Sequence, residues 1–373
     1  GARIDNLTLR NYRETIEPDS KNISLLLPFG STNPYYAEFG WLSRDTKVPD
    51  KDSVWKSSSS TLTPKKPITL TWHNSDGIKF VHEISLDDNF MFSVNQYIEN
   101  NGTKSATVYP YGLIKRYGTP EITDFYILHE GLLGVFDDVL TEVDYDEIQD
   151  TRQIKKSSKG GWIGITDKYW LTALIPDQHS RVDTHFSGKV TKGAENYQVD
   201  FRGDAKVIAP KSSAKASSKF FAGAKEAKLI LDYRDRLNIS RFDLAIDWGW
   251  FEFLTKPIFF VLMYFTDYLG NMGLSILLLT VLIKLAFFPL ANKSYRAMSK
   301  MKILQPEMMK IRDRFKDDKA KMNQEVMQLY KREKANPAAG CLPILPQIPV
   351  FFALYKVVFV TIEMRHAPFY GWL

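Results

Sequence analysis

Two long apolar segments near the C-terminal end constrain the fold of this 373-residue chain more than any other feature. They cover residues 272–291 and residues 341–362. The polar exceptions are Ser275, Thr280 and Lys284 in the first segment and Gln347, Lys356 and Thr361 in the second. About 20 apolar residues are enough for a helix to cross the hydrocarbon core of a bilayer. The sequence therefore predicts two transmembrane helices, over 271–291 and 341–362.

The positive charge of the chain is concentrated between these two segments. The net charge is +6 in total, but it is −2 over residues 1–250 and +7 over residues 291–336. Short loops rich in Lys and Arg stay in the cytoplasm. We therefore expect residues 292–340 in the cytoplasm and both flanking regions, including the tail 363–373, on the other side. Because a large N-terminal region must then be exported, we also expect an export signal or anchor span before Gly1.

Residues 1–223 have the pattern of β-strands. Period-two stretches bounded by turn residues recur, and no long 3.6-residue periodicity is present. Asn101-Gly102 is a dipeptide typical of a tight hairpin turn, and the stretch 162–176 predicts a second strand pair. We expect an all-β sandwich over 1–223, followed by a charged connector helix within 224–247.

Residues 248–270 are apolar and aromatic, but the run is too short to span a bilayer. It is interrupted by Glu252, Lys256, Pro257 and Asp267. Because tryptophan prefers the headgroup level of a membrane, the segment is predicted to be an amphipathic helix lying in the interface. The expected anchors are Trp248, Trp250 and Phe251. A helix buried in a protein core is the alternative.

Signatures of catalysis and metal binding are missing from the sequence. There is no G-x-S-x-G, no H-E-x-x-H, no P-loop and no G-x-G-x-x-G after a strand. Cys341 is the single cysteine and cannot form an internal disulfide, and the six histidines are too scattered for a zinc cluster. The acidic stretch 137–150 lacks the spacing of a calcium loop and is interpreted as a solvated hairpin face. We expect no enzyme, no metal and no cofactor.

The basic region has the spacing of a helical hairpin. Five apolar residues follow one another at intervals of three and four: Met301, Leu304, Met308, Ile311 and Phe315. Because proline would break a continuous helix, we expect the first arm of the hairpin to start at Pro306. We expect the turn between the arms at Asp317 and the end of the second arm at Asn336-Pro337. Six of the ten methionines lie between residues 298 and 327, and they form either an adaptable surface for other helices or a seam between the two arms. The two roles are compatible if the seam between the arms opens.

Lys284 is the most informative single residue. A charge inside a span costs a few kcal/mol and usually faces a water-filled cavity or a partner. The alternative is that Lys284 snorkels to the cytoplasmic end, about 9 Å away. In the second segment, three prolines between residues 343 and 349 free backbone carbonyls that, together with Gln347, need neighbouring helices or water.

The last 127 residues contain a specific set of motifs. They are Asp247-Trp248-Gly249-Trp250, Gly273-Leu274-Ser275-Ile276, Pro289-Leu290, Met298 to Pro306, Leu329-Tyr330-Lys331, and Asn336-Pro337 through Gly340-Cys341-Leu342-Pro343 to Gln347-Ile348-Pro349. The β region adds Ser158-Lys159-Gly160-Gly161-Trp162 and Ala173-Leu174-Ile175-Pro176. With these motifs the chain closely resembles the YidC membrane-protein insertases of the YidC/Oxa/Alb superfamily, of the Gram-negative type with a large periplasmic domain.

The resemblance implies a periplasmic β-sandwich, an interfacial helix and five core spans. The spans enclose a hydrophilic groove that is open to the cytoplasm and the lipid. The family carries a positive residue in this groove, usually arginine, and Lys284 is at the matching position; Thr280 and Gln347 are the other expected groove residues. An N-terminal anchor and the last three core spans are expected outside residues 1–373.

The function implied by the resemblance is that of a membrane-protein insertase and chaperone of the inner membrane. Nascent membrane proteins would enter the groove without ATP, alone or beside the Sec translocon, and leave sideways into the lipid bilayer. The hairpin would receive them from the ribosome or the signal-recognition receptor, through Met301, Leu304, Met308, Met309 and Arg312. No specific nucleic-acid binding is expected. The protein would be multi-pass, with residues 1–270 periplasmic and 292–340 cytoplasmic.

Two other functions fit parts of the sequence. A membrane-tethered periplasmic β-sandwich could bind glycans on aromatic platforms such as Trp72, Trp162 or Trp170, although tryptophans of this kind commonly belong to the core. An ion-conducting subunit with Lys284 in its pore is disfavoured, because one span with one charge specifies no selectivity ring.

Overall fold

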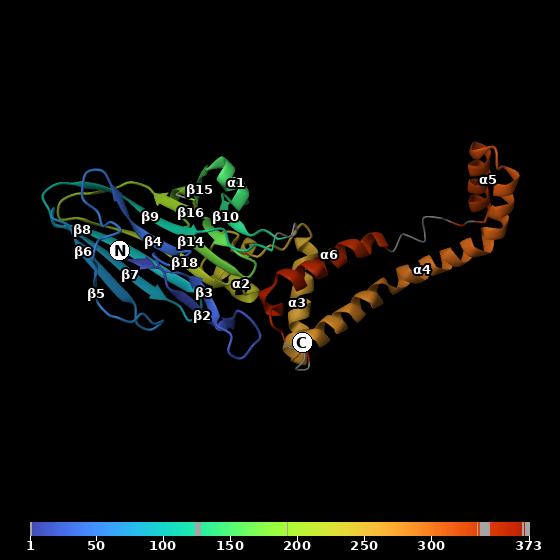
Figure 1. Cartoon of the computed structure of the whole chain (residues 1–373), viewed down its shortest axis with the longest axis horizontal. Coiled ribbons are helices and arrows are strands. Elements are labelled where there is room, and N and C mark those ends of the chain that lie inside the picture. Colours follow the sequence, from blue (N-terminus) through green and yellow to red (C-terminus); the bar gives the residue numbers. More distant parts are fainter. Residues whose placement is uncertain are drawn as a thin grey trace. The chain divides into compact units, whose positions relative to one another are not determined.

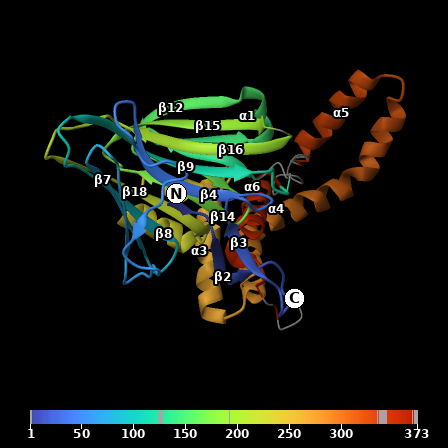
Figure 2. The ribbon, with the colours of Figure 1, turned by 60° about the vertical axis from the view of Figure 1, so that its left-hand side comes forward.

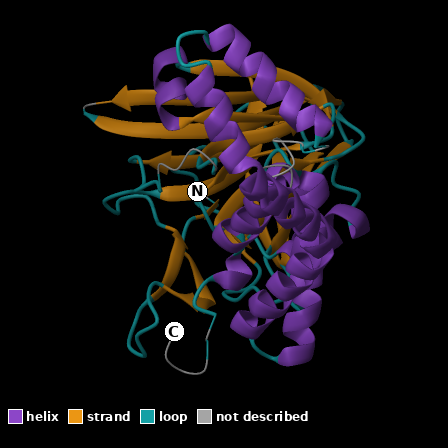
Figure 3. Ribbon diagram, turned by 90° about the vertical axis from the view of Figure 1, so that its right-hand side faces the viewer, coloured by secondary structure: helices purple, strands orange, loops and turns teal. Residues whose placement is uncertain are grey.

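The computed structural model describes residues 2–123, 128–191, 193–333, 335, 344–367 and 369. These residues form two compact units. The first, named here the β unit, consists of the residues up to Asp247 together with Val360–His366. The second, the helical unit, consists of Trp248–Phe359 and the residues from Ala367 onward. Figure 3 distinguishes strands from helices, and all strands of the described residues belong to the β unit.

The strands of the β unit are short to medium in length, and every strand pair is antiparallel (Figure 1). They are β1 (Arg3–Ile4), β2 (Leu7–Arg13), β3 (Asn22–Leu26), β4 (Tyr35–Ser43), β5 (Lys56–Ser57), β6 (Ile68–His73), β7 (Ile78–Leu86), β8 (Met91–Asn100), β9 (Ala106–Tyr117), β10 (Gly131–Phe136), β11 (Val139–Asp144), β12 (Gln153–Lys159), β13 (Trp162–Thr166), β14 (Trp170–Pro176), β15 (Arg181–Thr191), β16 (Ala194–Gly203), β17 (Lys206–Ile208) and β18 (Ser213–Ala224).

Two large sheets make up the sandwich. One has the strand order β1-β4-β9-β16-β15-β12, with β17 paired to β9, and the other has the order β11-β10-β13-β14-β18-β8-β7-β6-β5. Strands β2 and β3 form a separate pair. In Figure 2 the strands β12, β15, β16, β9 and β4 lie side by side as one layer. The antiparallel sandwich predicted from the alternating pattern is confirmed.

The main hydrophobic core lies between the two sheets. Ile114 and Val199 contribute from the first sheet, and Leu174 and Phe220 contribute from the second; all four side chains are completely buried. Along β9 the residues alternate between buried and half-exposed positions. This alternation follows from the period-two geometry of a strand with one face on the core.

The Asn101-Gly102 dipeptide is not the hairpin turn that the sequence predicts. Strands β8 and β9 on either side of it belong to different sheets, so the chain crosses between the two layers here. The side-chain amide of Asn100 donates to the carbonyl oxygens of Lys104 and Ile208, at 2.7 and 2.9 Å. A Cβ atom on Gly102 would collide with the backbone oxygen of Asp76. The glycine is therefore required for close backbone approach and not for a positive φ.

A tight hairpin occurs instead in the acidic stretch, between β10 and β11. Asp137 and Asp138 form its turn and both have positive φ angles, 46° and 67°. Two positive φ angles are what a two-residue type I′ turn needs, and aspartate tolerates them. The predicted strand pair within 162–176 is confirmed as the β13–β14 hairpin.

Helices occur in both units. The β unit contains α1 (Tyr145–Thr151), α2 (Ala227–Arg236) and the 3₁₀ turns η1 (Phe242–Ala245) and η3 (Ile362–Met364). The helical unit contains α3 (Glu252–Leu269), α4 (Met272–Arg314) and α5 (Lys319–Arg332). Helix α6 (Ile344–Val360) ends at the boundary between the two units.

Helix α4 corrects the prediction that the first arm of the hairpin starts at Pro306. It runs for 43 residues and contains both Pro289 and Pro306. A proline inside a helix removes one backbone hydrogen bond and bends the axis without necessarily ending the helix. Figure 1 shows that α4 bends toward its C-terminal end. The turn after it follows the expectation at Asp317, since α4 ends at Arg314 and Asp318 caps α5 by accepting from the Lys321 amide at 3.0 Å.

Among the described residues, α4 is the one helix long and apolar enough to cross a membrane by itself. Its most apolar 18-residue window is only 11% buried. Helix α6 is also apolar but has 17 residues. The residues that precede it, including Pro343 and the Asn336-Pro337 stop, lie outside the described residues.

Candidate functional site

The candidate groove residues of the first apolar segment lie on one face of α4. Thr280 and Lys284 are four residues apart, which places them one above the other on a helix. Thr280 is half-buried, and its hydroxyl donates to the Ile276 carbonyl at 2.8 Å. Lys284 is exposed and has neither an ion pair nor a hydrogen bond within the described part of the chain. In the described part of the chain, Lys284 is therefore an exposed cation on an apolar helix.

Gln347, the third predicted groove residue, lies on α6 and is half-buried. No hydrogen bond connects it to Lys284 or Thr280 in the described ranges. Its neighbour Ile348 is 45% exposed, and Phe351 four residues after Gln347 is 73% exposed. The two predicted groove-lining helices are thus present, but their polar residues are not brought together.

The hairpin of α4 and α5 has an apolar seam of its own. Leu304 and Leu329 are its buried residues, and Met308, Ile311 and Tyr330 pack against them. The Tyr330 hydroxyl donates to the Met308 sulfur at 2.7 Å. Met301 is half-buried, whereas Met309 and Arg312 are exposed. The methionines of the hairpin are therefore of both predicted kinds: Met308 lies in the seam between the arms, and Met309 is accessible on the surface.

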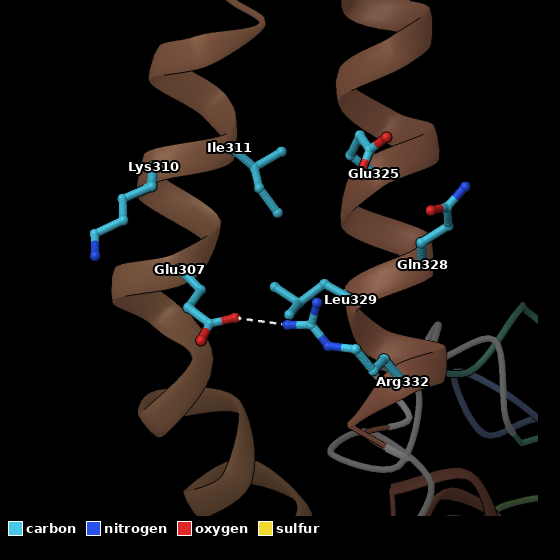
Figure 4. Close-up of a pocket in the computed structure, with 7 residues that line it drawn as sticks. All are labelled: Glu307, Lys310, Ile311, Glu325, Gln328, Leu329 and Arg332. Carbon is cyan, nitrogen blue, oxygen red and sulfur yellow. Dashed lines mark hydrogen bonds and ion pairs between the residues drawn. The ribbon is translucent and has the colours of Figure 1, made fainter.

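An open groove of about 400 Å³ runs along one side of this hairpin. It is lined by Glu307, Lys310, Ile311, Glu325, Gln328, Leu329 and Arg332 (Figure 4). Figure 4 shows Ile311 pointing toward the second arm and Lys310 pointing away from it. Arg332 and Glu307 form an ion pair across the groove at 3.0 Å. Both side chains of the pair are more than half exposed, so water screens it and it can open readily.

The predicted interfacial anchors behave differently from one another. Trp248 is 3% exposed, because its ring packs edge-on against Phe259 of α3 at 5.5 Å. Trp250 is 98% exposed, and Phe251 is half-buried beside Phe253. The burial of Trp248 makes it a packing residue of α3 and leaves Trp250 as the tryptophan that can reach a membrane interface.

Exposed aromatic residues of α3 were missed by the sequence analysis. Phe253, Tyr264 and Tyr268 are 71%, 69% and 83% exposed. In chain order, Phe253, Phe260, Tyr264 and Tyr268 are separated by seven, four and four residues. This helical spacing places them on one face of α3, and it is the sequence pattern from which the face could be predicted. This aromatic face is the structural counterpart of the predicted amphipathic helix.

The tryptophans considered as glycan platforms do not form a common surface. Trp162 is 1% exposed and packs against Phe242. Trp72 packs on a buried cluster around Trp41, whereas Trp170 packs on the main core and against Tyr12. A stacking platform needs an accessible ring face, and Trp162 has none.

Two family profiles match the chain. The profile described as the YidC periplasmic domain matches residues 1–261, and the profile described as the 60Kd inner membrane protein matches residues 264–373. The join between the two profiles falls inside α3. Their order along the chain is the same as that of the β unit and the helical unit.

Curated relatives cover the whole chain. The "Membrane protein insertase YidC" of Methylorubrum extorquens is 49% identical over 384 residues, which include 100% of this chain and 62% of the relative. Proteins of the same name from Bradyrhizobium diazoefficiens and Rickettsia bellii are 47% and 48% identical, with 62% and 67% of their own lengths covered. The chain thus spans a little under two thirds of the length of the relatives first matched.

Solved structures give only a weak similarity. A galactose mutarotase related enzyme from Lactobacillus acidophilus has a TM-score of 0.36 and 9% identity, over 50% of this chain and 82% of that one. A galactose mutarotase-like protein from Lactobacillus casei has a TM-score of 0.35 and 10% identity, over 50% and 85% of the two chains. These values are too low to support an inference about sugar binding.

Proposed function

The chain belongs to the YidC family of membrane protein insertases, and on that premise we propose that it is the periplasmic domain and first core region of a non-enzymatic insertase and membrane-protein chaperone. The family places it in the inner membrane. The glycan-binding alternative is not favoured, because both family profiles and the full-length relatives point to the insertase.

The observation that carries a mechanism is the exposed Lys284 on α4. A cation at this depth is tolerated only where water or a counter-charge reaches it. We propose that Lys284, with Thr280 on the same helix face and Gln347 on α6, lines a hydrated groove in the complete protein. Polar or acidic stretches of a nascent client enter this groove, which shortens the apolar distance that they must still cross. The client's apolar segment then partitions into lipid, driven by burial of its surface.

The second segment of the β unit supports a proposal for the membrane topology. Val360–His366 packs within the β unit, so both must lie on the same side of the membrane. If α4 crosses the bilayer, the chain has to cross back before residue 360, and α6 is the apolar helix available. Its 17 residues rise about 26 Å, close to the roughly 30 Å of a hydrocarbon core. We therefore propose two crossings, with residues 292–340 cytoplasmic and the β unit periplasmic.

The proposed receiving surface is the exposed side of the hairpin. Met309 and Arg312 are accessible there, whereas Leu304 and Met308 would take part only if the seam opens. Nascent chains, the ribosome, the signal-recognition receptor and the Sec translocon are the proposed partners. Photo-crosslinkers at positions 309 and 312 should capture ribosome-bound clients, and capture at Leu304 should be weaker. Equal capture from an exposed residue of the β unit, such as Val54, would argue against a specific surface.

A client-insertion assay on the full-length protein tests the groove. Lys284→Arg should insert normally, whereas Lys284→Ala and Lys284→Glu should be impaired for clients with acidic translocated tails and normal for clients with neutralised tails. Lys293→Ala is the matched control, because it removes the same charge from an exposed position nine residues further along α4. If Lys284→Ala inserts both client types as well as the unaltered protein does, Lys284 only snorkels to the headgroups and the groove role is wrong.

A further inference from the structure

Helix α2 begins without a capping side chain of its own. Its N-cap residue, Glu226, makes no side-chain hydrogen bond to the helix and instead accepts from the Tyr12 hydroxyl at 2.6 Å. The amide of Ala227 donates to Oε1 of Glu363, 136 residues further along the chain, at 2.8 Å. The first turn of a helix has amide groups that need an acceptor and favours negative charge. A residue of the segment after α6 therefore supplies the cap.

The same segment makes a second, separate contact with the β unit. The Arg365 guanidinium lies over the rings of Tyr169 and Trp170, at 5.7 and 5.4 Å from their centroids, and its Nη2 donates to the Glu14 carbonyl at 3.0 Å. Val360, the last residue of α6, and Ile362 are each 4% exposed. The segment is thus held by a helix cap, a cation–π contact and buried aliphatic side chains.

We propose that Val360–His366 is a clasp that fastens the chain leaving α6 to the β unit. The chain leaves the β unit at Asp247 and returns at Val360, so residues 248–359 are joined to the β unit by the chain itself at one end and by the clasp at the other. Any movement of the C-terminal end of α6 must then either move the β unit with it or open the clasp. The proposal stands on contacts within the β unit and is independent of the role of Lys284.

Hydrogen exchange at the Ala227 amide reports directly on the clasp. In the full-length protein in lipid nanodiscs, Glu363→Ala should speed exchange at this amide at least tenfold, because it loses its acceptor. Glu363→Gln keeps an acceptor oxygen and should leave the rate within twofold. Arg365 makes no contact with Ala227, yet Arg365→Ala should speed exchange at the Ala227 amide at least threefold if the contacts of Val360–His366 open together. Glu17→Ala and Arg10→Ala, at exposed positions of the β2–β3 region, should change nothing.

Two outcomes would overturn the clasp. Unchanged Ala227 exchange in Glu363→Ala would mean that the cap does not form in the membrane-embedded protein. A rise in Glu363→Ala without any rise in Arg365→Ala would reduce Glu363 to a local helix cap. Exchange in β14 and β18, measured in the same samples, verifies that the sandwich of each variant is folded.

Discussion

In the β unit eight large hydrophobic side chains of the described residues are exposed, whereas 25 are exposed in the much shorter helical unit. The β unit encloses its apolar residues between two sheets and carries a net charge close to neutral. The helical unit exposes many leucines, valines and phenylalanines of α4 and α6, among them Leu285, Phe288 and Phe351. A soluble protein rarely exposes so much apolar surface in one place. The difference teaches that the two units are built for different solvents, water in one and lipid or further helices in the other.

The largest expected effect concerns the polar link inside the β unit. Arg116 of β9 forms an ion pair with Asp167 at 2.6 Å, lies over the Tyr35 ring and is mostly buried, with 14% of its side chain exposed. The adjacent aspartate holds the pKa of Arg116 above its ordinary value despite the burial. Arg116→Ala leaves the carboxylate of Asp167 without its partner in a poorly hydrated site, so we expect the unfolding free energy to fall by about 3–5 kcal/mol.

Urea unfolding measures this loss, and an ion pair between two strands of the sheet that contains Arg116 is its control. Arg202 and Asp183 are 2.7 Å apart but each 48% exposed. Arg202→Ala should cost less than about 1 kcal/mol, because water screens the pair and solvates the remaining carboxylate. Similar losses in the two variants would contradict the interpretation of Arg116 as a buried link between elements.

The next prediction compares an apolar side chain exposed to lipid with one exposed to water. Val281 of α4 and Val54 of the β unit are both exposed, 53% and 88% respectively. Val281→Asp should cost about 3 kcal/mol, since an aspartate near the centre of a transmembrane helix is strongly disfavoured during insertion. Val54→Asp should change stability by less than about 0.5 kcal/mol. Membrane integration of the two variants, measured by carbonate extraction, distinguishes lipid exposure from water exposure, and full integration of both would remove the comparison.

The sequence predicted the elements of both units better than their connections. Alternation is a local signal, so the strands and the β13–β14 pair could be recognised, and the three-and-four spacing located the seam of Leu304, Met308 and Ile311. The turn at Asn101-Gly102 was predicted wrongly because the local dipeptide does not encode which sheet receives the next strand. Pro306 predicts a helix break because proline removes one backbone hydrogen bond, but α4 continues through it, since the loss of one bond bends a long helix without ending it.

Contacts between residues far apart in the chain could not be predicted at all. The Arg116–Asp167 pair and the Glu363 cap of α2 join residues 51 and 136 positions apart. Nothing in the local sequence selects these partners, because they are set by the packing of whole elements. The resemblance of the motifs suggests a groove role for Lys284 but names no neighbours for it, and the described residues contain no ion-pair or hydrogen-bond partner either.

A third effect arises from a buried histidine of the β unit. His82 of β7 is 1% exposed and stacks beside Trp55 at 4.5 Å, and its Nε2 has no hydrogen-bond partner among the described residues. Burial lowers the pKa of His82 to about 4. The unfolded chain, with an ordinary histidine pKa near 6.5, therefore binds the proton better than the folded chain does. Stability is complete above that value and falls as the pH drops toward 4, by roughly 2 kcal/mol between pH 7 and pH 4.5.

Urea midpoints measured across this pH range isolate the contribution of His82. His82→Leu should lose less stability on acidification than the unaltered chain, by the same roughly 2 kcal/mol. His179→Gln, which changes an exposed histidine in the loop after β14, should leave the pH dependence as it is. Parallel pH profiles for the unaltered chain and His82→Leu would assign the acid sensitivity to other groups.

The smallest expected effect concerns the hairpin of α4 and α5, the part of the helical unit that we expect in water. Leu304 is 9% exposed and its neighbour Ile303 is 74% exposed. With Cys341 replaced by serine, a membrane-impermeant maleimide should label Ile303→Cys at least tenfold faster than Leu304→Cys, a ratio that corresponds to about 1.4 kcal/mol of local opening. Met309→Cys and Met308→Cys form a second matched pair with the same order. Val281→Cys is exposed in the chain but should stay unlabelled, because the reagent cannot enter lipid. Equal labelling at 303 and 304 would mean that the seam is not closed in the membrane-bound protein, and rapid labelling at 281 would place that face of α4 in water.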